Sequence, residues 1–184
     1  MKKLIFIVGK TNSGKDTVAK LFKELYNIPM VCSYTTRSMR NYEIDGVQHY
    51  FINKADMTKL IKTEDIIAYT KSEKTGVEYC ATVESLTEET MIYIINPDGI
   101  KWFKEHGTKE IEVVTIYVDL DNDTILNRGL SRGDDIGVLK LRLESESREF
   151  NEFKDSKEYD YYIDNSDTYE ELKKQVEDIA GVIL

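Results

Sequence analysis

The sequence has few cysteines, no long apolar run and no excess of basic residues, and each shortage excludes a class of protein. Its two cysteines, Cys32 and Cys80, have neither the spacing of a metal site nor the number needed for a disulfide framework. No apolar stretch is long enough to span a bilayer. The net charge of −9 argues against a nucleic-acid polymer as a partner, because binding a phosphate backbone requires a basic face.

The rest of the composition is that of an ordinary globular protein. Of the 184 residues, 41% are hydrophobic and 32% are charged, which is enough to form a core within one domain, residues 1–184. Met1-Lys2-Lys3 precedes only five apolar residues, too few for a signal peptide. We therefore expect a cytoplasmic protein with no membrane partner. The oligomeric state stays open.

A glycine-bracketed loop follows the apolar run Leu4–Val8 and precedes a predicted helix at 16–26. Its frame, G-x-x-x-x-G-K, is that of a phosphate-binding loop between a strand and a helix. The glycines let backbone N–H groups point at phosphate oxygens, and Lys15 reaches the outer phosphates beside the positive end of the helix. The sequence therefore predicts a site for a nucleoside triphosphate. The predicted residues are Gly9, Lys10, Thr11, Asn12, Ser13, Gly14, Lys15, Asp16 and Thr17.

Asp16 stands where such loops usually carry a hydroxyl residue that holds magnesium, and Thr17 follows it. Asp16 can ligate Mg²⁺ directly or through water, or it can stabilise the first turn of the helix, and the residues leave both readings open. We predict Asp16 and Thr17 as the metal-side residues. The run Ser13–Thr17 resembles that of some phage deoxynucleoside monophosphate kinases.

Strands that alternate with helices predict an α/β fold with a parallel sheet flanked by helices. The expected strands are 4–8, 29–33, 65–71, 77–81, 91–95, 111–118 and 159–163, and the expected helices are 16–26, 54–62, one ending at His106, 121–130, 138–153 and 168–179. Residues 33–82 depart from the alternation and are interpreted as an insert. Turns are predicted at Asp45-Gly46 and at Lys74-Thr75-Gly76.

Arginines gather in two segments of this acidic chain. Residues 33–40 read Ser-Tyr-Thr-Thr-Arg-Ser-Met-Arg, followed by Glu43, Asp45-Gly46 and His49-Tyr50-Phe51. Residues 128–133 read Arg-Gly-Leu-Ser-Arg-Gly, and Arg142-Leu143 follows. An arginine fork can hold two phosphate oxygens, and phosphoryl transfer depends on positioning and charge neutralisation. These segments resemble the guanylate kinase family, and the resemblance extends over nearly the whole chain.

The resemblance implies a nucleoside monophosphate kinase fold with a nucleoside-monophosphate-binding (NMP-binding) insert at 33–82 and a short lid at 128–137. It also implies ATP-dependent phosphorylation of a nucleoside monophosphate, most naturally GMP or dGMP, with Mg²⁺ accompanying ATP. The implied catalytic residues are Lys15, Arg37, Arg128, Arg132 and Arg142. The implied acceptor-binding residues are Ser33, Arg37, Arg40, His49, Tyr50 and Tyr79.

Some positions depart from the family pattern. The family's phosphate-binding tyrosine falls on His49 without gaps, whereas a one-residue slip gives Tyr50, which we favour slightly. Ala68 replaces the guanine-reading glutamate, Ala81 replaces a hydroxyl residue and Asn96 replaces an aspartate. The acceptor base and sugar therefore stay open.

Two alternatives follow from these departures. One is a deoxynucleoside monophosphate kinase with a different base preference. The other is a non-catalytic nucleotide-binding module resembling the guanylate-kinase-like domains of scaffold proteins. Those modules typically lack a working phosphate loop, so the retained Lys15 and arginines argue against the second alternative.

Overall fold

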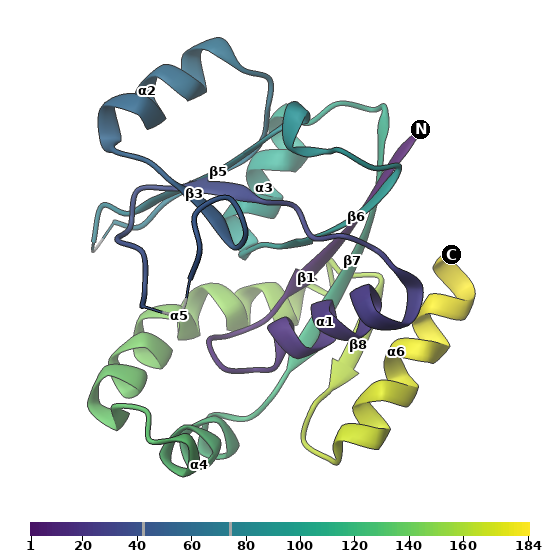
Figure 1. The fold of residues 1–184 in the computed structure, drawn as a ribbon. Helices are drawn as coiled ribbons and strands as arrows, with labels where there is room; N and C mark the ends of the chain where they lie inside the picture. Colours follow the sequence, from purple (N-terminus) through teal and green to yellow (C-terminus); the bar gives the residue numbers. More distant parts are fainter. Residues whose placement is uncertain (42, 74) are drawn as a thin grey trace.

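The computed structural model describes residues 1–41, 43–73 and 75–184. Its elements in chain order are β1 (Lys2–Val8), α1 (Lys15–Tyr26), β2 (Ser33–Thr35), β3 (His49–Phe51), α2 (Lys54–Thr63), β4 (Ile66–Lys71), β5 (Glu78–Thr82), a 3₁₀ turn (Val83–Ser85), β6 (Thr90–Ile94), α3 (Pro97–His106), β7 (Ile111–Asp119), α4 (Asn122–Arg132), α5 (Ile136–Ser156), β8 (Tyr161–Asp164) and α6 (Tyr169–Ile183). Figure 1 shows their arrangement.

The central sheet has the order β6-β1-β7-β8, and every pair in it is parallel. Because parallel strands end at the same edge, the segments that follow β1, β7 and β8 meet there. Ile5 of β1 pairs with Ile92 on one side and Val114 on the other, which sets β1 at the centre of the sheet. The predicted α/β fold is confirmed.

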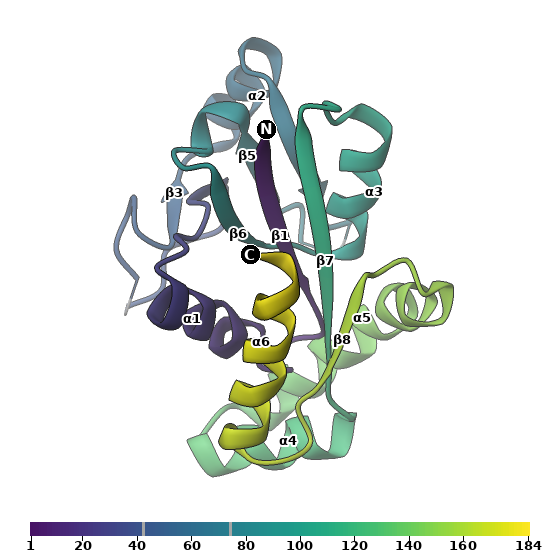
Figure 2. The same ribbon diagram turned by 90° about the vertical axis from the view of Figure 1, so that its right-hand side faces the viewer.

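Helices cover both faces of this sheet, which explains why β1 is a continuous apolar run. Figure 2 shows α1 and α6 on one side of the sheet, with α3 and α5 on the other. Ile5 and Ile7 belong to the core cluster with Phe22 and Val176, whereas Phe6 belongs to a second cluster with Phe150. Alternate side chains of β1 thus fill two cores.

Residues 33–82 form a second sheet with the order β3-β2-β5-β4. β3 runs parallel to β2, while β5 runs antiparallel to both β2 and β4. Gly46 adopts a φ of 77° at the predicted Asp45-Gly46 turn, a conformation that favours glycine. Gly76, with a φ of 64°, lies in the other predicted turn, whose first residue, Lys74, is outside the described residues.

Several element boundaries differ from the prediction, and two of these differences have a structural reason. The strand expected at 29–33 is reduced to a single bridge between Met30 and Ile92, and the regular strand β2 begins only at Ser33. The segment leaves the central sheet at this point because it connects the two sheets. Helix α5 starts at Ile136 instead of 138, since the carboxylate of Asp135 accepts the Val138 N–H and caps it.

Throughout the described ranges, no helix combines the length and the apolar character needed to cross a bilayer.

Candidate functional site

The predicted phosphate loop lies between β1 and α1 at the carboxyl edge of the central sheet. Gly14 precedes α1 with a φ of 101°, and Asn12 has a φ of 56°. A Cβ on Gly14 would lie 2.2 Å from the Asn165 side-chain nitrogen, so this glycine is required for both conformation and space. The loop therefore has the tight, glycine-dependent curl that aims backbone N–H groups inward.

A residue from the C-terminal part of the chain, Asn165, supports this loop through hydrogen bonds. The Asn165 side-chain amide donates to the Ser13 carbonyl at 2.8 Å, and the Asn165 N–H donates to the Asp119 carbonyl at 3.0 Å. Asn165 is buried, and it follows β8 directly. The hydroxyl of Ser13 is also buried, and it makes no hydrogen bond within the described chain.

The ammonium of Lys15 folds back over the loop and donates to the Lys10 carbonyl at 2.7 Å. Burial lowers the pKa of Lys15, while the negative charges of Asp16 and Glu146 act in the opposite direction. The Lys15 ammonium thus lies close to the loop backbone and near the carboxylates of Asp16 and Glu146. From this position it can bind a phosphate held by the loop.

Three side-chain contacts connect the loop to α4 and α5. Thr11 donates its N–H to the Glu146 carboxylate at 2.7 Å, and Asn12 donates its amide to the Asp134 carboxylate at 3.2 Å. Lys10 donates to the side-chain oxygen of Asn122 at 3.2 Å. The sequence prediction missed these partners, although the spacing of Arg142 and Glu146 places both on one face of α5.

The second sheet brings several predicted acceptor residues to one face. Ser33 pairs with His49 across β2 and β3, and Thr35 pairs with Tyr79 across β2 and β5. Because directly paired residues point to the same side of a sheet, Ser33, His49 and Tyr79 share a face. The Ser33 hydroxyl lies 2.9 Å from Nδ1 of His49, and the rings of His49 and Tyr79 meet edge to face at 5.7 Å.

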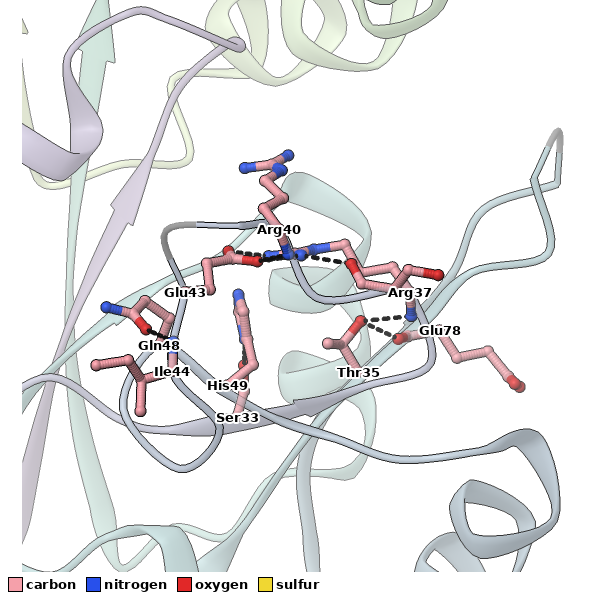
Figure 3. A network of polar contacts seen from close by, with 10 residues as sticks. Ser33, Thr35, Arg37, Arg40, Glu43, Ile44, Gln48, His49 and Glu78 are labelled. Carbon is pink, nitrogen blue, oxygen red and sulfur yellow. Dashed lines mark hydrogen bonds and ion pairs between the residues drawn. The ribbon is translucent and has the colours of Figure 1, made fainter.

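Arg37 and Glu43 form a bidentate ion pair on this face (Figure 3). Glu43 also accepts the Arg40 N–H at 2.8 Å, and its side chain is 4% exposed. The hydrogen bond to Glu43 raises the pKa of Arg37, to which Tyr79 adds a smaller effect. Glu43 belongs to the sequence motif that follows residues 33–40, but it was not among the predicted site residues.

His49, and not Tyr50, lies with these residues. Figure 3 shows the His49 ring rising from Ser33 toward the Arg37–Glu43 pair. Burial lowers the pKa of His49, and the charge of Arg37 lowers it further. Tyr50 instead stacks on Tyr34, with ring centroids 5.0 Å apart, and points to the other face. This arrangement favours His49 over Tyr50 as the residue beside Arg37, and the contact of either residue with an acceptor phosphate stays a prediction.

The three later arginines lie apart from this face. Both ribbon views place α4 at the opposite end of the molecule from β3 (Figures 1 and 2). Arg128 donates to the Asp167 carbonyl at 3.4 Å, and Arg132 forms an ion pair with Asp134 at 2.9 Å. Arg142 is exposed on α5. The described residues thus place Arg37 and His49 on the second sheet and the three later arginines on the α4–α5 segment.

The positions that depart from the family pattern are buried or structural here. Ala68 pairs with Ala81 across β4 and β5, and they are 1% and 0% exposed. Both alanines belong to the core cluster that contains Phe6. Asn96 caps α3 by accepting the Gly99 N–H at 3.1 Å.

The donor set at the start of α1 fits a magnesium ion that is bound mainly by phosphate and water. Asp16 is exposed and Thr17 is half-buried in the first helical turn, and both offer the oxygen ligands that Mg²⁺ prefers. Within the described residues, no three His, Cys, Asp or Glu side chains form a metal cage. A site completed by nucleotide phosphates is therefore the arrangement that these residues suit.

Comparisons with known proteins agree with this architecture. The family model described as guanylate kinase matches residues 1–180. The guanylate kinase of Rickettsia felis is 31% identical, covering 93% of this chain and 89% of its own length. That of Clostridioides difficile is 29% identical, covering 98% of this chain and 86% of its own length. The crystal structure of guanylate kinase from Anaplasma phagocytophilum has a TM-score of 0.70 at 22% identity, covering 98% of this chain and 84% of that one. The chain belongs to the guanylate kinase family.

Proposed function

We propose that this protein transfers the γ-phosphoryl group of ATP to GMP. One observation carries the proposal: the chain has two separate clusters whose donors suit an anion, the loop at Gly9–Lys15 and the face that holds Arg37 and His49. A nucleotide-binding module needs only one such cluster. A phosphotransferase needs one for each of its two polyanionic substrates.

The loop binds the donor. Its N–H groups and the Lys15 ammonium neutralise the β- and γ-phosphates, while the α1 N-terminus adds its partial positive charge. Asp16 and Thr17 are proposed to face the Mg²⁺ that accompanies ATP, and this ion supplies charge neutralisation between the phosphates when bound.

The face of the second sheet binds the acceptor phosphate. Arg37 offers a planar guanidinium fixed by Glu43, and the ring of His49, held at Nδ1 by its contact with Ser33, offers its second nitrogen. Tyr79 and Arg40 complete the proposed set. Residues 33–82 thereby act as the NMP-binding insert.

Residues 128–137 act as the lid in this proposal. Arg128, Arg132 and Arg142 would move toward the loop when both nucleotides are bound and neutralise charge on the transferring group. Closure would also exclude water, which otherwise accepts the phosphoryl group.

The test is ADP formation from Mg·ATP with each ribo- and deoxynucleoside monophosphate, for the wild type and for Lys15→Ala. We expect turnover that depends on GMP and a loss of about 10³-fold in Lys15→Ala. If turnover occurs only with a different nucleoside monophosphate, that nucleotide and not GMP is the acceptor. ATP binding without turnover on any acceptor would contradict the kinase and favour a binding module.

A further inference from the structure

Glu146 lies at the phosphate loop in a position that an anion would take. Its carboxylate accepts the Thr11 N–H at 2.7 Å, and its charge acts on the Lys15 ammonium. Backbone N–H groups of such a loop and its lysine are the donors that hold phosphate oxygens. The carboxylate thus occupies one backbone donor of the loop and places its charge near the loop lysine.

The Thr11 N–H is a single donor. An oxygen of a phosphate and an oxygen of Glu146 compete for it, and two anions side by side also repel each other in a partly buried site. Glu146 comes from the middle of α5, 135 residues further along the chain. The contact therefore connects occupancy of the loop with the position of α5.

Two further contacts connect the same loop to the same part of the protein. Asn12 donates to Asp134 in the turn between α4 and α5, and Lys10 donates to Asn122 at the start of α4. Asp134 is itself paired with Arg132. These contacts place two acidic side chains, Glu146 and Asp134, against the loop.

We propose that Glu146 competes with the nucleotide's phosphates for the loop, so that binding of the donor releases α5 from Thr11. This inference rests on the proposed function for the identity of the donor. It makes Glu146 a residue that weakens donor binding and couples it to movement of the α4–α5 segment, including Arg132 and Arg142.

The experiment measures the Kd of ATP and of inorganic triphosphate by calorimetry for the wild type, Glu146→Gln and Glu146→Ala. The matched control is Glu144→Gln, an exposed carboxylate two residues earlier that faces away from the loop. It removes the same charge from the same helix, so it reports the long-range effect of net charge alone.

We expect Kd for both ligands to fall about threefold in Glu146→Gln, which keeps an acceptor oxygen but loses the charge, and about tenfold in Glu146→Ala, which removes the competing group; a tenfold change corresponds to about 1.4 kcal/mol. Glu144→Gln should leave Kd near the wild-type value. A thermal unfolding scan of each variant confirms that it is folded.

Equal Kd values for the wild type and both Glu146 variants, or weaker binding in the variants, would overturn the inference. A purely structural contact would destabilise the loop and give that weaker binding. If no protein in the set binds ATP, the proposed function fails, and the triphosphate titration then decides the inference by itself.

Discussion

The guanidinium of Arg37 is held by both carboxylate oxygens of Glu43, at 2.6 and 2.5 Å. Glu43 lies six residues later and also accepts the Arg40 N–H, so one buried carboxylate organises both arginines of the segment. Such a bidentate pair fixes the plane of the guanidinium. It therefore also fixes the directions in which the remaining N–H groups of Arg37 point.

Replacing Arg37 by lysine should therefore impair acceptor binding, although the charge is kept. We expect KM for GMP to rise about 10- to 100-fold, since hydrogen bonds to charged groups are worth about 1.5–3 kcal/mol. Steady-state kinetics with varied GMP measure this. Arg148→Lys, in an exposed pair with Glu152, is the control and should change nothing. An unchanged KM in Arg37→Lys would remove Arg37 from the acceptor site.

Stability in acid should depend on Glu43. The hydrogen bond from Arg37 lowers the pKa of Glu43 to about 2, below the ordinary value of 4.5. The ionised carboxylate therefore stabilises the folded state above about pH 4.5, and this contribution is lost as the pH falls toward about 2.

Urea unfolding between pH 2.5 and 6 measures the effect. The difference in unfolding free energy between the wild type and Glu43→Gln should be largest at pH 6 and should shrink toward pH 2.5. Glu152→Gln serves as the comparison on the protein surface. A wild-type advantage that is constant across this range would contradict the assignment.

His49 and Tyr50 should behave differently when each is changed. His49→Phe removes the ring nitrogens beside Ser33 and should raise KM for GMP about tenfold, the value of one lost hydrogen bond to a charged phosphate. Tyr50→Phe keeps the stack on Tyr34 and should have little effect. The two KM values are compared in one assay, and a larger effect at Tyr50 would reverse the assignment.

Gly14→Ala should destabilise the protein, whereas Gly181→Ala should not. The first places a Cβ against Asn165 at a φ of 101°, and a left-handed conformation alone costs a non-glycine residue about 1–2 kcal/mol. The second lies in α6, where a Cβ meets nothing within 4 Å, and alanine should add roughly 0.5–1 kcal/mol. Free energies of unfolding in urea test both, and equal effects would contradict the described loop geometry.

The sequence predicted most elements because their signals are local. Asn53 caps α2, its side chain accepting the Asp56 N–H, at the start of the helix predicted at 54–62, and β1 follows its apolar run. The loop was predictable because its glycines, lysine and flanking elements are contiguous in the chain.

Other features depend on contacts between distant segments, and local patterns do not report those. A motif match left the register one residue uncertain, and only the pairing of β2 with β3 shows that His49, and not Tyr50, shares a face with Ser33. Glu146 approaches Thr11 only because α5 packs at the carboxyl edge of the sheet. The buried pair of Ala68 and Ala81 likewise follows from the pairing of β4 with β5.

The hydrogen bond from Asn165 to the Ser13 carbonyl joins residues 152 positions apart in the chain. During synthesis from the N-terminus, the loop is therefore made well before the residue that supports it. A nascent chain that stops before β8 lacks this support, so nucleotide affinity should develop late in biosynthesis. The loop would thus mature only after a segment translated much later has folded against it.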